Sequence, residues 1–237
     1  MARERLRKRA VTKPIAAKRP ARAAAREVVA TGSAADFIPP NPTLPKLRVA
    51  SMTCRGCHLW TLGTQTVFGE GPKRARVMIV GEQPGDQEDR AGHPFVGPSG
   101  KLLDRALEEA GIDRGDVYVT NAVKHFKWER GEKSARRIHK KPNDAEIRAC
   151  HPWLDEEIRL VQPEVVVCLG ATAAQSIMGK SFKVTKERGR AVKAPNGETV
   201  IATVHPSSVL RAPDAAARAQ AERDFFTDLK KVARQLS

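Results

Sequence analysis

From residue 76 onward, two patterns of hydrophobic residues alternate along the chain. Four short, largely apolar runs have the length of buried strands. These runs cover 76–81, 117–123, 164–170 and 199–204. Apolar residues at helical spacing predict helices at 99–110, 143–161, 171–178 and 214–236. Strands that are apolar on both faces must be covered on both sides. The pattern therefore predicts an α/β fold, a three-layer sandwich with a central parallel four-stranded sheet and helices on both faces.

Residues 1–45 lack this periodicity and differ in composition. The first thirty residues hold ten Lys and Arg against two Glu, and four prolines follow between positions 39 and 45. A basic, alanine-rich stretch that is then broken by prolines is typical of disordered segments. We therefore expect a basic N-terminal arm and linker over 1–45 and a folded domain over 46–237.

The charge of the whole chain points to a polyanionic partner. The formal net charge is +15, and surface Lys and Arg raise the local concentration of phosphate groups. A basic tail that only aids solubility is the alternative. We expect no membrane partner, because no apolar stretch approaches the length of a bilayer span and the N-terminus lacks the apolar core of a secretory signal. These features favour a bacterial, cytoplasmic, nucleoid-associated protein.

Polar side chains gather where three predicted strands end, which is where an open parallel sheet binds its ligands. The first strand leads into Gly-Glu-Gln-Pro-Gly-Asp and then Pro-Phe-Val-Gly, the second ends in Asn, and the fourth leads into His-Pro-Ser-Ser-Val-Leu-Arg. The candidate residues in these segments are Glu82, Gln83, Asp86, Asp89, Phe95, Asn121, His205, Ser207, Leu210 and Arg211. Each motif alone is compatible with an ordinary turn.

Together and in this order, the motifs resemble those of the uracil–DNA glycosylase superfamily, family four, over roughly residue 53 to the C-terminus. The resemblance implies an enzyme that cleaves the N-glycosidic bond of uracil in single- or double-stranded DNA, and we expect a monomer. Such cleavage needs donors at the oxygens of the leaving base and negative charge near the cationic sugar. Glu82 and Asp86 supply carboxylates for catalysis, and His205 can donate to uracil O2.

The remaining strand-end residues fit recognition of the base and the DNA. Asn121 can pair with N3–H and O4 of uracil, and cytosine would leave its buried amide unpaired. Phe95 offers a flat face to a flipped base, and Gln83 and Asp89 complete the expected uracil site. The DNA-binding residues of this group are Ser207, Leu210 and Arg211. The last two would fill the gap left in the duplex, although Leu210 could instead be a core residue.

Four cysteines suggest a metal centre. Cys54 and Cys57 form a Cys-x-x-Cys pair, whereas Cys150 lies in a predicted helix and Cys168 in a predicted strand. The resemblance implies that all four hold a [4Fe–4S] cluster. Zinc bound by four thiolates is the alternative, and the spacing does not separate the two. Cys168 could also be a free thiol buried in its apolar strand.

The segment between Asn121 and the helix at 143–161 is long and basic, which predicts contact with phosphates. It contains Arg136, Arg137, Ile138, His139 and Lys140. With Gln83, this segment is similar to the UdgX branch, in which a His attacks the deoxyribose C1′ after uracil leaves. The resemblance implies that His139 is this nucleophile and that Arg136, Arg137 and Lys140 bind DNA. The branch usually has Lys where Ala135 stands, which alters loop charge and leaves the nucleophile in place.

Two other functions remain open. The first is a conventional glycosylase that releases an abasic site, which covalent capture by His139 would distinguish. The second is a DNA-binding protein without catalysis, and the presence of Glu82, Asn121 and His205 argues against it.

Overall fold

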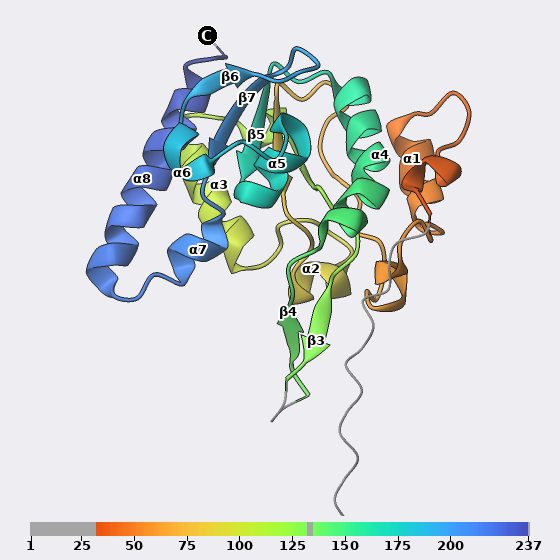
Figure 1. The fold of residues 1–237 in the computed structure, drawn as a ribbon. Coiled ribbons are helices and arrows are strands. Elements are labelled where there is room, and N and C mark those ends of the chain that lie inside the picture. The colour runs from red at the N-terminus through yellow and green to blue at the C-terminus, as the bar shows by residue number, and fades with distance from the viewer. Residues whose placement is uncertain (1–31, 132–134, 237) are drawn as a thin grey trace, which may run out of the picture.

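A mostly parallel sheet forms the centre of the protein in the computed structural model, which describes residues 32–131 and 135–236 (Figure 1). Its parallel strands are β1 (Val77–Gly81), β2 (Val117–Asn121), β5 (Val165–Leu169) and β7 (Thr199–Thr203). A short fifth strand, β6 (Ala191–Lys193), pairs antiparallel with β7, so the strand order is β2-β1-β5-β7-β6. The four predicted strands are confirmed. The prediction of four strands in all missed this edge strand, because its three residues are exposed or only partly buried and form no apolar run.

Helices cover both faces of the sheet and bury two separate apolar cores. One face carries α3 (Pro98–Ala110), α7 (Pro206–Leu210) and α8 (Ala215–Ala233). The other carries α4 (Asp144–Val161), α5 (Ala171–Met178) and α6 (Val184–Glu187). Figure 1 shows α8 and α4 on opposite sides of the strands. This arrangement confirms the predicted three-layer α/β sandwich. Among the described helices, none is long and apolar enough to cross a membrane.

The start of α4 is fixed by the local sequence. The side chain of Asn143 accepts a hydrogen bond from the amide of Glu146, and the Glu146 carboxylate accepts one from the amide of Asn143. This reciprocal capping box satisfies two amides that no helical carbonyl can reach. It places the preceding segment, which carries His139, next to the end of the sheet.

The N-terminal part of the described chain packs against α4. It consists of η1 (Ala34–Phe37), α1 (Leu44–Ser51) and η2 (His58–Thr61). Ala34 and Leu47 are fully buried in a third core that also contains Trp153 of α4. The folded domain therefore begins before residue 45, where the composition placed the end of the arm. The basic residues 1–31 lie outside the described part of the chain.

Three short elements complete the fold around the strand ends. They are α2 (Asp86–Ala91), which follows β1, η3 (Arg114–Asp116), which precedes β2, and a hairpin of β3 (Trp128–Arg130) and β4 (Arg137–His139). The hairpin pairs Trp128 with His139 and Arg130 with Arg137, and it projects from the domain beside α2 (Figure 1). The segment expected to be a long basic loop therefore contains antiparallel strands that hold His139 in a defined register.

Candidate functional site

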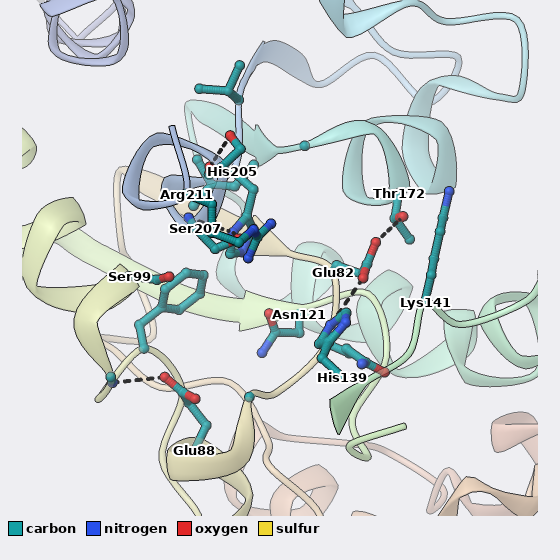
Figure 2. Close-up of a pocket in the computed structure, with 18 of the residues that line it drawn as sticks. Glu82, Glu88, Ser99, Asn121, His139, Lys141, Thr172, His205, Ser207 and Arg211 are labelled. Atoms are coloured by element: carbon teal, nitrogen blue, oxygen red, sulfur yellow. Dashed lines mark hydrogen bonds and ion pairs between the residues drawn. The ribbon is translucent and has the colours of Figure 1, made fainter. Parts of the chain in front are cut away.

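A cavity of about 880 Å³ lies at the carboxyl ends of the parallel strands. It is bordered by residues at or just after the ends of β1, β2, β5 and β7 and by the hairpin, as an open parallel sheet predicts. Ten of the candidate residues line it: Glu82, Gln83, Asp86, Phe95, Asn121, Arg136, His139, His205, Ser207 and Arg211. Figure 2 shows Glu82, Asn121, His139 and His205 around the same space. The lining omits Asp89, Arg137, Lys140 and Leu210.

Glu82 and His139 face each other in this cavity. Oε1 of Glu82 lies 3.4 Å from Nε2 of His139, and the other carboxylate oxygen accepts a hydrogen bond from the hydroxyl of Thr172 (Figure 2). Partial burial lowers the pKa of His139, and Arg211 adds to this effect while Glu82 opposes it. The imidazole therefore favours its neutral form, which has a lone pair available for attack on an electrophile.

His205 begins α7 and presents one ring nitrogen to the cavity. Its Nδ1 accepts from the amide of Ser207 at 3.2 Å and lies 2.9 Å from the Ser207 hydroxyl. Burial lowers the pKa of His205 to about 4, and the nearby Arg211 and His139 contribute. A neutral ring that accepts at Nδ1 carries its proton on Nε2. His205 is therefore a fixed hydrogen-bond donor.

Asn121 and Phe95 meet at Gly81, the last residue of β1. A Cβ atom at Gly81 would lie 2.2 Å from Oδ1 of Asn121 and 2.9 Å from the Phe95 ring, so only glycine fits there. Asn121 is 3% exposed, and its side-chain amide forms no hydrogen bond within the described part of the chain. The Phe95 and His205 rings are roughly parallel, with centroids 6.4 Å apart. Together these groups offer an unpaired amide and flat surfaces to a planar ligand.

Asp89 points away from the cavity, contrary to its expected role in uracil binding. It is fully buried and accepts from the Thr64 amide at 2.8 Å, the Thr64 hydroxyl at 2.6 Å and Arg137 Nη1 at 2.5 Å. Arg137 also donates to the Asp86 carboxylate and stacks over Phe126. The expected phosphate ligand Arg137 thus joins the hairpin to α2. Its side chain is 11% exposed and is directed at these two carboxylates.

Asp86 lines the cavity but is also held by arginines. Desolvation would raise the pKa of Asp86, yet hydrogen bonds from Arg90 and Arg137 outweigh it and lower the pKa. Its carboxylate therefore stays ionised near the cavity, with much of its hydrogen-bonding capacity directed at these two side chains.

Gln83 uses its side-chain amide to hold the base of the hairpin. Nε2 donates to the carbonyls of Lys127 at 3.2 Å and Lys140 at 3.0 Å, and Oε1 accepts from the Lys127 amide at 3.1 Å. An amide engaged in three backbone hydrogen bonds is not free to read a base. Its carbonyl partner Lys140 is adjacent to His139, so the Gln83 side chain holds the backbone beside that histidine. Gln83 also lines the cavity, and its expected role in uracil binding stays a prediction.

The basic rim of the cavity consists of Arg136, Arg211 and Lys141, together with the hydroxyl of Ser207. Lys140 lies outside it and pairs with Glu129 at 2.9 Å. Leu210 is partly buried and packs against the core formed by α3 and α8. The core alternative for Leu210 therefore fits the structure better than insertion into a duplex.

The cysteines divide into two groups. Cys54, Cys57 and Cys150 share the third core, whereas Cys168 lies within β5, fully buried and paired between β1 and β7. Burial raises the pKa of Cys57 to about 11 and that of Cys150 to about 12. Among the described residues, no three Cys, His, Asp or Glu side chains stand close enough together to hold a metal ion. Ligation of a cluster by all four cysteines stays a prediction.

Three of these cysteines still have the chemistry of a metal site. The backbone amide of Lys124 donates to Cys150 Sγ at 3.3 Å, and the Trp153 indole donates to Cys54 Sγ at 3.4 Å. Beside Cys57, the Nδ1 atom of His58 is buried without a hydrogen-bond partner in the described chain. Soft sulfur donors, amides directed at sulfur and an unsatisfied ring nitrogen fit a bound metal or cluster.

Thr172 and Lys141 are among the cavity residues that were absent from the sequence-based candidates. Thr172, on the first turn of α5, contacts Glu82, and Lys141 follows β4 at the rim. No acidic residue or histidine follows β5, so the sequence carries no catalytic signal at that strand end. The position of β5 between β1 and β7 could still have identified Thr172 as a candidate.

Comparisons with known proteins agree with this geometry. A model of the uracil DNA glycosylase superfamily matches residues 68–230. A type-4 uracil-DNA glycosylase of Sulfurisphaera tokodaii is 36% identical over 191 residues, which are 77% of this chain and 82% of the relative. One from Thermotoga maritima is 40% identical over 159 residues, 67% of this chain and 78% of the relative. A type-5 uracil-DNA glycosylase of Pyrobaculum aerophilum is 30% identical over 184 residues, 70% and 76% of the two chains.

Proposed function

The chain belongs to the uracil DNA glycosylase superfamily, and from this we propose that it excises uracil from DNA and captures the resulting sugar on His139. The observation that carries the proposal is the convergence of Glu82, Asn121, His139 and His205 on one cavity. These residues come from four separate places in the sequence, and each supplies a group that the reaction needs.

Asn121 and His205 would read and activate the base. The free Asn121 amide can accept from uracil N3–H and donate to O4, whereas cytosine presents the opposite pattern. The Nε2–H of His205 can donate to uracil O2, where negative charge develops as the bond to the sugar lengthens. Phe95 gives the flipped base a surface to stack on. Selection of uracil and stabilisation of the leaving anion thus rest on neutral donors and acceptors.

Cleavage and capture would follow in two steps. The C1′–N1 bond breaks, uracil leaves with the electron pair as an anion, and Glu82 stabilises the cationic sugar. The Nε2 lone pair of His139 then forms a bond to C1′, and the imidazolium product loses its remaining ring proton to solvent. The lowered pKa of His139 supports this role, because the neutral ring is the nucleophile.

Turnover without capture is the alternative chemistry. His139 is 49% exposed on the side chain and lies at the rim, so water can also reach a sugar bound there. Two features favour capture over water. The Gln83 amide holds the backbone next to His139, and Glu82 faces its Nε2, so the nucleophile is positioned before the cation forms.

The DNA would approach across the basic rim. Arg136, Arg211, Lys141 and Ser207 surround the cavity and can contact phosphates of single- or double-stranded DNA. Stronger nonspecific attraction would come from the arm at 1–31, which lies outside the described residues. A monomeric state and a nucleoid-associated location in a bacterial cytoplasm stay predictions.

We also propose an iron–sulfur cluster held by Cys54, Cys57 and Cys150 with one further ligand other than Cys168. The three thiols lie between the N-terminal segment and α4. A cluster there would supply a covalent tie between these two parts, and the cavity residues carry out the chemistry without it.

Incubation with a uracil-containing oligonucleotide tests the function. We expect one equivalent of free uracil per active enzyme and a slowly migrating protein–DNA band on a denaturing gel. Matched oligonucleotides with thymine or cytosine should give neither product. Free uracil with an unshifted strand would establish the conventional glycosylase, and absence of free uracil would support a DNA-binding protein without catalysis.

A further inference from the structure

In the part of the chain that the structure describes, the Glu82 carboxylate that lines the cavity accepts one hydrogen bond, and Thr172 donates it. Thr172 is 3% exposed, and its hydroxyl donates to Oε2 of Glu82 (Figure 2). Oε1 of the same carboxylate faces His139 Nε2 at 3.4 Å. Within the described chain, these two residues account for all the hydrogen bonds and ion pairs of the Glu82 side chain. Thr172, Glu82 and His139 therefore form a continuous chain from the buried end of α5 to the rim.

The sequence places Thr172 there through the turn that starts α5. Gly170 lies between β5 and α5 with a φ of 89°, a conformation that favours glycine, and its amide donates to the Thr203 carbonyl of β7 at 2.8 Å. The first turn of α5 consequently begins between the residues that follow β1 and those that follow β7. Thr172 is β-branched, so its χ1 rotamer is restricted in a helix and the direction of its hydroxyl is limited to few choices.

We propose that Thr172 is a positioning residue that holds Glu82 with Oε1 toward His139 and the bound sugar. This inference rests on the proposed glycosylase function. The terminal torsion of a glutamate is broad and roughly two-fold, so a carboxylate without a partner rotates freely. A hydrogen bond from a buried neutral donor to Oε2 fixes that rotation and leaves Oε1 for the reaction. His139 cannot serve the same purpose, because it is half exposed and would itself be consumed by capture.

A purely structural role for the hydroxyl has little support. Threonine hydroxyls within helices often bond the carbonyl one turn earlier. Thr172 is the second residue of α5, and its hydroxyl instead bonds a side chain ninety positions earlier in the sequence. Thr172 is itself buried, and the next two residues, Ala173 and Ala174, belong to the apolar core. The shape of its side chain and its hydroxyl can therefore be tested separately by substitution.

Substitution of Thr172 by Val and by Ser separates the effect of side-chain packing from the effect of the hydrogen bond to Glu82. Thr172→Val keeps the shape and removes the hydroxyl, whereas Thr172→Ser keeps the hydroxyl. The measurements are the single-turnover rate constant for uracil release at saturating enzyme and the Kd for an oligonucleotide with uncleavable 2′-fluorodeoxyuridine. We expect Thr172→Val to slow release by about 10- to 100-fold, the size of one hydrogen bond to a charged group, with Kd unchanged within about 3-fold. Thr172→Ser should restore the rate to within about 3-fold of wild type.

The outcomes distinguish this inference from the function on which it rests. Wild-type release of uracil with an equal rate for Thr172→Val overturns the positioning role and leaves the glycosylase intact. The positioning role is also overturned if Thr172→Val weakens DNA binding without slowing uracil release, or if Thr172→Ser releases uracil as slowly as Thr172→Val. If the wild-type protein releases no uracil, the function and the inference fall together. Thr172→Ala provides a second variant without the hydroxyl, and circular dichroism confirms that each variant is folded.

Discussion

The backbone amide of Ser207 donates to Nδ1 of His205 over 3.2 Å. Because a backbone amide can only donate, this bond requires an unprotonated Nδ1 and leaves the ring proton on Nε2, toward the cavity. The first turn of α7 thus sets the tautomer of the residue that precedes it. A histidine in this state donates without carrying charge, which suits a buried partner for the oxygen of a leaving base.

Replacing His205 tests this role. We expect His205→Ala to slow uracil release by about 10²–10³-fold, the cost of removing one donor from a developing anion. Ser207→Ala is the matched control, because it removes the hydroxyl and keeps the amide that sets the tautomer. It should change the rate by less than about 5-fold. Equal losses in the two variants would show that the hydroxyl, and not the amide, orients the ring.

The parallel strands could be predicted because burial on both faces leaves a continuous apolar run in the sequence. β6 and the hairpin have no such signal. Their strands are three residues long and largely exposed, and pairing depends on partners that are distant in sequence or lie across a turn. The boundary of the arm was also missed. The segment around Ala34 has the composition of a linker, but Ala34 is fully buried and attaches this segment to the folded domain.

The site could be predicted where chain topology alone decides the position. Asn121 ends a parallel strand, Glu82 and His205 follow two others, and the three therefore meet at one edge of the sheet. The direction of a side chain within a loop is not encoded in that topology. Asp89 and Gln83 lie in the same loop as Glu82 but turn toward Thr64 and the hairpin backbone. Their polarity marked them as candidates, and local hydrogen bonding determined what they do.

His139 should be required for capture and dispensable for cleavage. His139→Ser removes the imidazole and leaves Glu82, Asn121 and His205 in place, so water takes the sugar. We expect uracil release within about 10-fold of wild type and no covalent product on a denaturing gel. Lys140→Ala is the control, because this neighbouring side chain is exposed and paired with Glu129. Mass spectrometry of the digested wild-type adduct should locate the deoxyribose on His139, and its presence on any other residue would contradict the assignment.

Acid should suppress capture more than cleavage. Burial lowers the pKa of His139, so its neutral form predominates at neutral pH and protonation begins below the usual value of about 6.5. Burial lowers the pKa of His205 to about 4, so that ring keeps its neutral tautomer further into acid. As pH falls from 7 toward 5, the ratio of adduct to released uracil should decline. A ratio that is constant over this range in single-turnover assays would exclude the His139 lone pair as the group that determines capture.

Removal of individual cysteines should separate ligands from a core residue. Cys150→Ala should lose most bound iron and the visible absorbance of thiolate-bound iron, because Cys150 shares a core with Cys54 and Cys57. Cys168→Ala should keep both, because Cys168 lies in the middle of β5. The iron-to-protein ratio of purified variants measures the difference. Loss of iron from Cys168→Ala to the same extent would return Cys168 to the ligand set, and zinc in the wild-type protein would replace the cluster.

Arg137 should stabilise the fold more than it binds DNA. Its guanidinium bonds the buried Asp89 at 2.5 Å and lies over the rings of Phe126 at 5.3 Å and Trp128 at 5.5 Å. Removing one partner of a buried ion pair leaves an uncompensated charge. Arg137→Ala should therefore lower the free energy of unfolding by roughly 3–5 kcal/mol, measured by urea denaturation. The matched control is Arg130→Ala. This exposed residue lies directly across the hairpin, and its loss should cost less than about 0.5 kcal/mol.

The salt dependence of DNA binding decides between the two roles of Arg137. A residue that contacts phosphate contributes about 0.7–0.9 to the slope of log K against log salt. Because the guanidinium of Arg137 faces Asp86 and Asp89, Arg137→Ala should leave that slope unchanged under conditions where the variant is folded. Arg211→Ala, which removes an exposed arginine from the rim, should reduce it. If Arg137→Ala reduced the slope as Arg211→Ala does and left the unfolding free energy unchanged, Arg137 would be a phosphate ligand after all, and the hairpin would be held to α2 by other contacts.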